Sequence, residues 1–296
     1  MEAVYPSKTL LIYSFKSIIP QLPETFKIQA HSFENLDEII NGKYKIDTFL
    51  RFYSNIGVEM QIQDFEKLEE GEMVFAVPEK SAFPYKELLE FFEIDRVMQI
   101  GGNYVTKLVN HTITKKTYSL RITTIPDNIL NSEKLQKIFS KLKHIKNLNH
   151  KGIIKLYNFF NISRNFYFIC EYVEGISLHQ YLTNNSSLIE DKIKKIVKQI
   201  LDAVAFFHSQ GIYFVGVKLH NIQVTNENIP LIKLIDFRVS TFMEDIKQID
   251  YRAYSPPEIL KSPTKRKRGP VIDAWSIGAL SYYFFLRKFP FYGKII

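Results

Sequence analysis

The sequence Phe214-Val215-Gly216-Val217-Lys218-Leu219-His220-Asn221, followed further along by Ile235-Asp236-Phe237-Arg238, decides the fold of this chain. It falls within a longer series of short segments that keep one order. The earlier members are Ile100-Gly101-Gly102, Tyr118-Ser119-Leu120-Arg121-Ile122, Leu148-Asn149-His150 and Cys170-Glu171-Tyr172-Val173-Glu174-Gly175. The later members are Ser255-Pro256-Pro257-Glu258 and Asp273-Ala274-Trp275-Ser276-Ile277-Gly278. Each segment is short, but the order and spacing of the whole series are specific.

Composition and charge divide the chain into two parts. Of the 296 residues, 46% are apolar and 24% are charged, which is typical of a globular protein. Residues 1–93 hold 9 Lys and Arg against 16 Asp and Glu, a net charge of −7, whereas residues 94–296 carry +15. This asymmetry predicts a boundary near residue 90. The acidic part would repel a polyanion, so we do not expect a nucleic-acid partner. For the basic part, a solvated lysine-rich surface is favoured over an anion-binding one.

Cysteine use and hydropathy indicate the surroundings of the protein. The single cysteine, Cys170, cannot form an internal disulfide, which fits a reducing compartment and predicts a cytoplasmic protein. The basic run Lys265–Arg268 leaves nuclear import open as an alternative, although a solvated loop is the favoured interpretation. The longest nearly uncharged apolar run, Ala274–Leu286, has 13 residues and is too short to span a bilayer. We therefore expect no membrane association.

The first 80 residues predict a small module of short strands around one helix. Strands are expected at 9–14, 25–30 and 72–77, and residues 45–52 suggest a short helix that leads into a strand at 50–53, with Gly57 at the following turn. This pattern suggests a ubiquitin-like β-grasp module over residues 1–80. The segments Phe49–Gly57 and Val74–Pro78 resemble the second half of doublecortin-type domains, which share that fold. Residues 81–90 are expected to be a linker that runs into helix.

From Phe91 the pattern changes to strands followed by helices. Strands are predicted at 92–100, 104–111 and 117–125, and again around 153–160 and 167–173. Between them, apolar residues at helical spacing from Leu135 to Leu148 predict an amphipathic helix. The clearest helix is 188–208, which is expected to end at Gly211. This order predicts a strand-rich lobe followed by a helical lobe.

Taken in order, the series of segments resembles the eukaryotic protein-kinase domain, aligned from residue 91 to residue 296. The resemblance implies an α+β fold in which the N-terminal module precedes a bilobal kinase-like domain. The N-lobe would cover residues 91–173 and the C-lobe residues 174–296. The family's helical lobe continues for three more helices beyond the position of Ile296, so we expect an incomplete, C-terminally truncated C-lobe.

The expected phosphate-binding parts depart from the family pattern. The glycine-rich loop, G-x-G-x-x-G in kinases, is reduced here to Gly101 and Gly102, and a strand turn is favoured over a phosphate cradle. Arg121 takes the position of the lysine that holds the phosphates, and Lys141 takes that of its glutamate partner. Two cations repel each other, so the activating ion pair of the family cannot form.

The hinge is the part of the nucleotide site that resembles the family best. By resemblance, the backbone groups of Glu171 and Val173 would bind adenine, and Cys170 takes the gatekeeper position. Val109 and Ser119 are expected to complete an apolar slot. This leaves weak binding of ATP and Mg²⁺, or of a flat heterocycle, open. Cys170 itself is expected to be a small buried apolar residue and not a reactive thiol.

The catalytic loop departs most clearly from kinase chemistry. The pattern H-R-D-L-K-P-E-N aligns with residues 214–221, so Gly216 replaces the catalytic aspartate while Lys218 is retained. Asn221 and Asp236 match the two residues that hold Mg²⁺ in kinases, and their oxygens suit that ion. Asp273 is expected to be a helix N-cap whose carboxylate also holds the backbone of the catalytic loop.

Three hypotheses of function follow. The first is a catalytically inactive pseudokinase that acts as a signalling scaffold or regulator through protein partners. The second is a divergent serine/threonine kinase that uses Lys218, Asn221 and Asp236, with water in place of the base. The third, from the doublecortin resemblance, is a microtubule-binding module, which the charge of −7 disfavours. An acidic module that docks a basic partner, including the basic half of its own chain, fits the charge better.

Overall fold

The computed structural model describes residues 7–15, 18–19, 23–46, 48–125, 133–185, 189–214, 217–226, 230–235, 253–258 and 270–291. The chain forms two compact units. The first contains residues 1–126 and 156–171, and the second contains residues 127–155 and 172–296. Among the helices within the described ranges, none has both the length and the apolar character of a membrane span.

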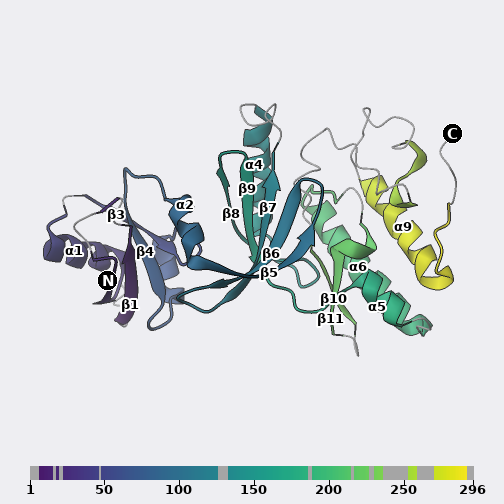
Figure 1. Cartoon of the computed structure of the whole chain (residues 1–296), viewed down its shortest axis with the longest axis horizontal. Coiled ribbons are helices and arrows are strands. Elements are labelled where there is room, and N and C mark those ends of the chain that lie inside the picture. Colours follow the sequence, from purple (N-terminus) through teal and green to yellow (C-terminus); the bar gives the residue numbers. More distant parts are fainter. Residues whose placement is uncertain are drawn as a thin grey trace. The chain divides into compact units, whose positions relative to one another are not determined.

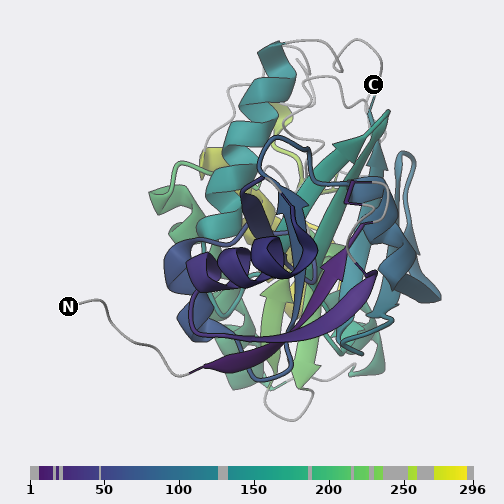
Figure 2. The same ribbon diagram turned by 90° about the vertical axis from the view of Figure 1, so that its left-hand side faces the viewer.

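The first unit begins with a mixed four-stranded sheet. Its strands are β1 (Lys8–Ser14), β2 (Thr25–Ala30), β3 (Leu50–Ser54) and β4 (Met73–Pro78), in the order β2-β1-β4-β3. β1 pairs parallel with β4, whereas the β1–β2 and β3–β4 pairs are antiparallel. Helix α1 (Phe33–Tyr44) follows β2 and lies across the sheet (Figure 2). The short 3₁₀ helix η1 (Ile62–Lys67) precedes β4. The strands predicted at 9–14, 25–30 and 72–77 are therefore confirmed.

The helix of this module lies earlier in the chain than the sequence prediction placed it. The predicted helix within 45–52 is wrong, because α1 ends at Tyr44 and Lys45 takes a left-handed conformation with φ of 54°. At the other end, the Ser32 side chain caps the helix by accepting a hydrogen bond from the Asn35 N–H, at 3.1 Å. The helix buries Phe33, Leu36 and Ile40, whose three- and four-residue spacing is typical of an amphipathic helix.

The two faces of the module sheet pack against different partners, because successive residues of a strand point to opposite faces. One face packs with α1 and buries Leu10, Ile12, Leu50, Phe52, Val74 and Ala76. The other face belongs to a second cluster and buries Tyr53, Met73, Phe75 and Val77. The module therefore has apolar side chains on both sides of its sheet.

A five-stranded antiparallel sheet forms the rest of the first unit. Its strands are β5 (Phe92–Ile100), β6 (Tyr104–His111), β7 (Thr117–Thr124), β8 (Leu156–Ile162) and β9 (Asn165–Glu171), in the order β5-β6-β7-β9-β8. Tyr118 pairs with Val109, and Leu120 pairs with Ile169, so these four side chains share one face. The predicted strands of this region are confirmed, with small shifts at their ends.

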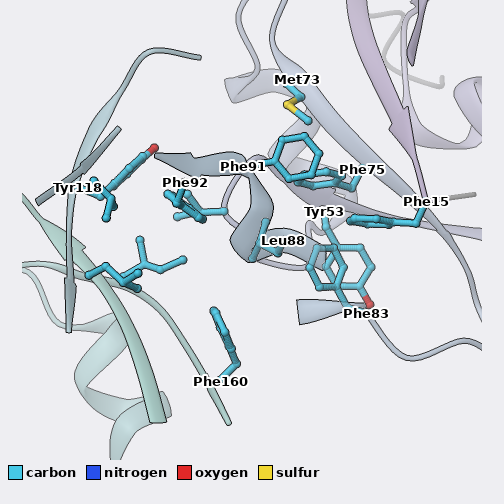
Figure 3. Close-up of a cluster of buried hydrophobic side chains, with 14 of the residues drawn as sticks. Phe15, Tyr53, Met73, Phe75, Phe83, Leu88, Phe91, Phe92, Tyr118 and Phe160 are labelled. Atoms are coloured by element: carbon cyan, nitrogen blue, oxygen red, sulfur yellow. The ribbon is translucent and has the colours of Figure 1, made fainter. Parts of the chain in front are cut away.

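The two sheets of the first unit share one aromatic core, shown in Figure 3. Phe75 from the module sheet packs edge-on against Phe91, at 5.4 Å between ring centroids. The same cluster includes Tyr118 and Phe160 from the five-stranded sheet. Between the sheets lie α2 (Tyr85–Leu88) and the 3₁₀ helix η2 (Leu89–Phe91) (Figure 1). The expected linker at 81–90 thus contains helix, as predicted, and Leu88 within it is fully buried.

The second unit is mainly helical. It contains α4 (Glu133–Asn147), α5 (Leu178–Asn184), α6 (Glu190–Ser209) and α9 (Pro270–Leu286). A small sheet of β10 (Ile176–Ser177), β11 (Ile222–Asn226) and β12 (Leu231–Leu234) accompanies them, and the 3₁₀ helix η3 (Leu219–Asn221) precedes β11. The predicted helix 188–208 corresponds to α6, and Gly211 has a φ of +70° just beyond its end, which suits a residue without Cβ.

Candidate functional site

The face of the five-stranded sheet opposite the aromatic core carries Arg121 together with the predicted slot residue Ser119 and the predicted gatekeeper Cys170. Ser119 pairs with both Leu108 and Cys170, and Arg121 pairs with Thr106 and Phe168. Paired residues of antiparallel strands lie on the same face, so Leu108, Ser119 and Cys170 line this side together. Cys170 is buried, as predicted. We call this surface the slot face.

The predicted slot of Val109 and Ser119 is wrong. Val109 pairs with Tyr118 and is fully buried in the aromatic core on the other side of the sheet. A shift of one residue along a strand moves a side chain to the opposite face. Leu108, the buried neighbour of Val109, therefore takes the place beside Ser119 that the sequence prediction gave to Val109.

The glycine hairpin between β5 and β6 is closed by its own tyrosine. The Gly101 N–H donates to the Tyr104 carbonyl at 2.8 Å, and the Tyr104 ring lies so close to Gly101 that any Cβ there would overlap it. A Cβ at residue 101 would force the Tyr104 ring to shift. The ring thus occupies the space next to the backbone of Gly101, the first glycine of the predicted phosphate loop.

Arg121, on strand β7, packs against the same tyrosine ring. Its guanidinium carbon lies over the Tyr104 ring at 3.8 Å from the centroid. Such a cation–π contact contributes about 0.5–2 kcal/mol, depending on how far the pair is removed from water. Both side chains are half-buried. Gly101, Tyr104 and Arg121 therefore form one stack.

The hinge segment is fixed by a residue that the sequence prediction missed. The Gln223 side-chain amide donates to the carbonyls of Val173 and Gly175, each at 2.9 Å. Gly175 has a φ of +143°, and a Cβ there would overlap the Val224 carbonyl. The Val173 carbonyl, one of the predicted hinge groups, thus accepts a hydrogen bond from Gln223 of the same chain. A glutamine between the apolar residues Ile222 and Val224 was the signal available in the sequence.

Of the catalytic loop, the structure describes residue 214 and residues 217–221. Gly216 lies outside the described residues, and so does Asp236. Lys218 precedes η3, and its carbonyl accepts a hydrogen bond from the Asn221 N–H at 3.0 Å. The Asn221 carbonyl accepts from the Ile235 N–H at 2.9 Å, so Asn221 is buried close to the residue that precedes Asp236. The predicted Mg²⁺ pair itself is untested.

Asp273 ties the helix α9 to the first residue of the catalytic loop, Phe214. Its fully buried carboxylate accepts from the Phe214 N–H at 2.8 Å and lies 2.9 Å from His208 Nε2. The expected contact with this backbone is therefore present. The expected N-cap position is wrong, because α9 begins at Pro270 and Asp273 lies inside its first turn.

A buried tyrosine packs beside the same helix. The Ser276 hydroxyl donates to the Tyr254 carbonyl at 2.9 Å. Burial, the largest effect, raises the pKa of Tyr254 to about 12, which keeps its hydroxyl neutral.

The other predicted partners are distributed over the two units. Gly101, Gly102, Arg121 and Glu171 belong to the first unit. Val173, Lys218 and Asn221 belong to the second, as does Lys141, which is exposed on α4. Within the described ranges, no cluster of three His, Cys, Asp or Glu side chains could hold a metal ion.

A model of the protein kinase domain matches residues 94–295. The chain belongs to the protein kinase family. The match begins three residues after the predicted start of the kinase domain. The five-stranded sheet and the mainly helical second unit agree with the α+β, two-lobed fold that the resemblance implied.

Several curated protein kinases are similar to this kinase domain. Serine/threonine-protein kinase SIK1 of Rattus norvegicus is 31% identical over 207 residues, which cover 69% of the chain and 26% of that protein. SIK2 of Gallus gallus is 32% identical over 224 residues, 74% of the chain and 27% of that protein. The maternal embryonic leucine zipper kinase of Xenopus laevis is 28% identical over 70% of the chain and 32% of its own length. The matched region thus spans about a quarter to a third of these relatives.

Proposed function

We propose that this kinase-family protein is a pseudokinase, which acts as a scaffold or regulator and does not transfer phosphate. The stack of Gly101, Tyr104 and Arg121 supports the proposal, because the Tyr104 ring lies against the first glycine of the loop that resembles the family's phosphate loop. The cation that would neutralise phosphate charge is engaged with an aromatic ring instead. Binding of ATP requires the Tyr104 ring to move, so it is expected to be weak.

The sequence of the catalytic loop supports the same conclusion. Gly216 stands where the family has the catalytic aspartate, and it has no carboxylate to accept the proton of a substrate hydroxyl. General-base assistance contributes roughly 10²–10⁴-fold to such reactions. Phosphoryl transfer depends on positioning and charge neutralisation, and in this chain both are weakened.

A divergent serine/threonine kinase is the second candidate. Its support is that Lys218 and Asn221 are retained and that the similar proteins are named as serine/threonine kinases. This candidate needs tight binding of ATP with Mg²⁺. Nucleotide binding is therefore the property that separates the two candidates.

We also propose that residues 1–80 form a ubiquitin-like β-grasp module. The support is the order β2-β1-β4-β3, with parallel central strands and one helix after the first hairpin. Its contact with the five-stranded sheet of the kinase domain, here called the kinase sheet, combines aromatic packing with hydrogen bonds that involve Asn55 and Ile56. A basic partner for its acidic surface remains part of the proposal, whereas microtubule binding is disfavoured by the charge of −7.

A thermal-shift titration of the full chain with ATP and Mg²⁺ tests the proposal. Ligand at about 100 times its Kd stabilises a protein by about 2.7 kcal/mol, which is a shift of several degrees. We expect the wild-type protein to shift by less than about 1 °C at millimolar ATP, and Tyr104→Ala to shift further because Arg121 is released.

The matched control is Tyr282→Ala, which removes an exposed tyrosine of the second unit. It should respond to ATP as the wild-type protein does. A shift of several degrees in the wild-type protein, unchanged by Tyr104→Ala, would favour the divergent kinase.

A further inference from the structure

The turn Asn55–Gly57, between β3 and β4, ties the module to the kinase sheet through the side chain and carbonyl of Asn55 and the carbonyl of Ile56. The Asn55 amide donates to the hydroxyls of Tyr118 and Thr114, each at 3.3 Å. The Ile56 carbonyl accepts from the buried Asn158 side chain at 2.8 Å. These contacts all lie within the first unit. They give the module a fixed position on the five-stranded sheet.

Gly57 completes this turn on its apolar side. It has a φ of +71°, and a Cβ there would lie 2.8 Å from the Phe83 ring and 2.9 Å from Leu88. A left-handed backbone and close approach of both side chains therefore require glycine.

His111 holds the same turn from the kinase side. It is 0% exposed, at the end of β6. Its Nδ1 accepts from the N–H groups of Ile113 and Thr114, at 3.3 and 3.2 Å. Nδ1 therefore carries no proton, and the neutral ring has its proton on Nε2. Nε2 donates that proton to the Asn55 carbonyl at 2.9 Å.

The surroundings of His111 disfavour a charge. Phe91 stacks on the ring at 5.8 Å and Phe92 meets it edge-on at 5.4 Å. Burial, the largest effect, lowers the pKa of His111, although the Asn55 carbonyl opposes this. Asn55 also contacts the buried hydroxyl of Tyr118, and burial raises the pKa of that hydroxyl. The charged side chains on the elements packed around the ring lie toward the surface: Glu59, Glu72, Glu90, Glu93, Lys115 and Lys116.

We propose that neutral His111 is a pH-sensitive latch that holds the N-terminal module on the kinase sheet. A proton added to Nδ1 would face two N–H donors, so both of their hydrogen bonds would be lost. It would also place a positive charge in the aromatic core that joins the two sheets. Protonation therefore favours a state in which the Asn55–Gly57 turn has left the five-stranded sheet.

The direction of the pH dependence follows from this geometry. In the open state His111 regains its ordinary pKa of 6.5, whereas in the closed state its pKa is lower. The open state therefore binds more protons, and the closed contact loses stability as the pH falls below about 6.5. When a single proton is taken up, the equilibrium constant for opening is about tenfold larger at about pH 5.5 than at neutral pH.

Hydrogen exchange of the full chain, followed by mass spectrometry, tests the latch. Protection of residues 52–60 and 108–119 is compared at about pH 7.5 and about pH 5.5, after correction for the intrinsic exchange rate. We expect protection in the wild-type protein to fall by about tenfold at the lower pH. In His111→Gln, whose amide cannot be protonated in this range, we expect little change. His31→Gln, at an exposed histidine of the module, should behave as the wild-type protein does.

An equal fall in His111→Gln and wild type, or no fall in wild type, would overturn the proposal. If His111→Gln does not fold, the imidazole nitrogens of the wild-type protein give the answer by NMR. The latch requires that the His111 ring is a single Nε2–H tautomer at neutral pH. It also requires that the ring becomes protonated over the same pH range in which protection from hydrogen exchange is lost. A ring that is charged while the contact stays closed would contradict it.

Discussion

Replacing Phe75 with alanine is expected to lower the free energy of unfolding of the first unit by about 3–5 kcal/mol, the usual loss for a fully buried phenylalanine. Phe75 is 0% exposed in the centre of β4. Its ring contacts four others at centroid distances of 5.0–5.7 Å: Tyr13, Phe15, Phe83 and Phe91. The substitution leaves a cavity where the module, α2 and η2 meet, and both sheets are expected to lose stability.

Urea unfolding followed by far-UV circular dichroism measures this effect, and hydrogen exchange of β1 and β4 assigns it to the first unit. The matched control is Phe49→Ala, because Phe49 is 73% exposed in the same module. That substitution should change the stability by no more than about 0.5 kcal/mol. If both variants were equally stable, the shared aromatic core would not hold the two sheets together.

Replacing Asp273 with alanine is the second change with a large expected effect. It removes the acceptor of the Phe214 N–H and the partner of His208, and it leaves a buried backbone donor without a hydrogen bond. An unsatisfied buried group of this kind costs about 1–3 kcal/mol, and the loss of a charged acceptor increases the cost. We expect the second unit to lose about 3 kcal/mol.

Fluorescence of Trp275, the only tryptophan, reports on the same helix during unfolding. Asp202→Ala is the control, because that carboxylate is exposed on α6 and pairs with the surface residue Lys198. Its loss should cost about 0–1 kcal/mol. An Asp273→Ala protein as stable as Asp202→Ala would show that Asp273 does not anchor the start of the catalytic loop.

Much of the fold could be predicted because strand and helix periods are local properties. The five strands from Phe92 to Glu171 and the helix that ends before Gly211 were correctly predicted from such patterns. Helix α1 was missed although Leu36 and Ile40 have helical spacing and Ser32 is a good N-cap. The error at Val109 has a different cause, because the face that a side chain takes depends on strand register, which a one-residue shift reverses.

The candidate site was harder to predict because its main contacts join residues far apart in sequence. The substitution at Arg121 was visible, but its stacking on Tyr104 depends on how β6 and β7 pair. The aromatic packing between the module and the kinase sheet could not be predicted from net charge, which ignores apolar side chains. The basic docking partner that the charge of −7 suggested stays a prediction.

Phosphate transfer from radiolabelled ATP is the most direct test of the proposed pseudokinase. The full chain would be assayed with Mg²⁺ on several generic protein substrates and on itself, beside an active protein kinase and the variants Asn221→Ala and Asp236→Ala. We expect the wild-type protein to give only background incorporation, equal to that of both variants. Incorporation above background that either substitution abolishes would contradict the proposal and show that this chain is an enzyme.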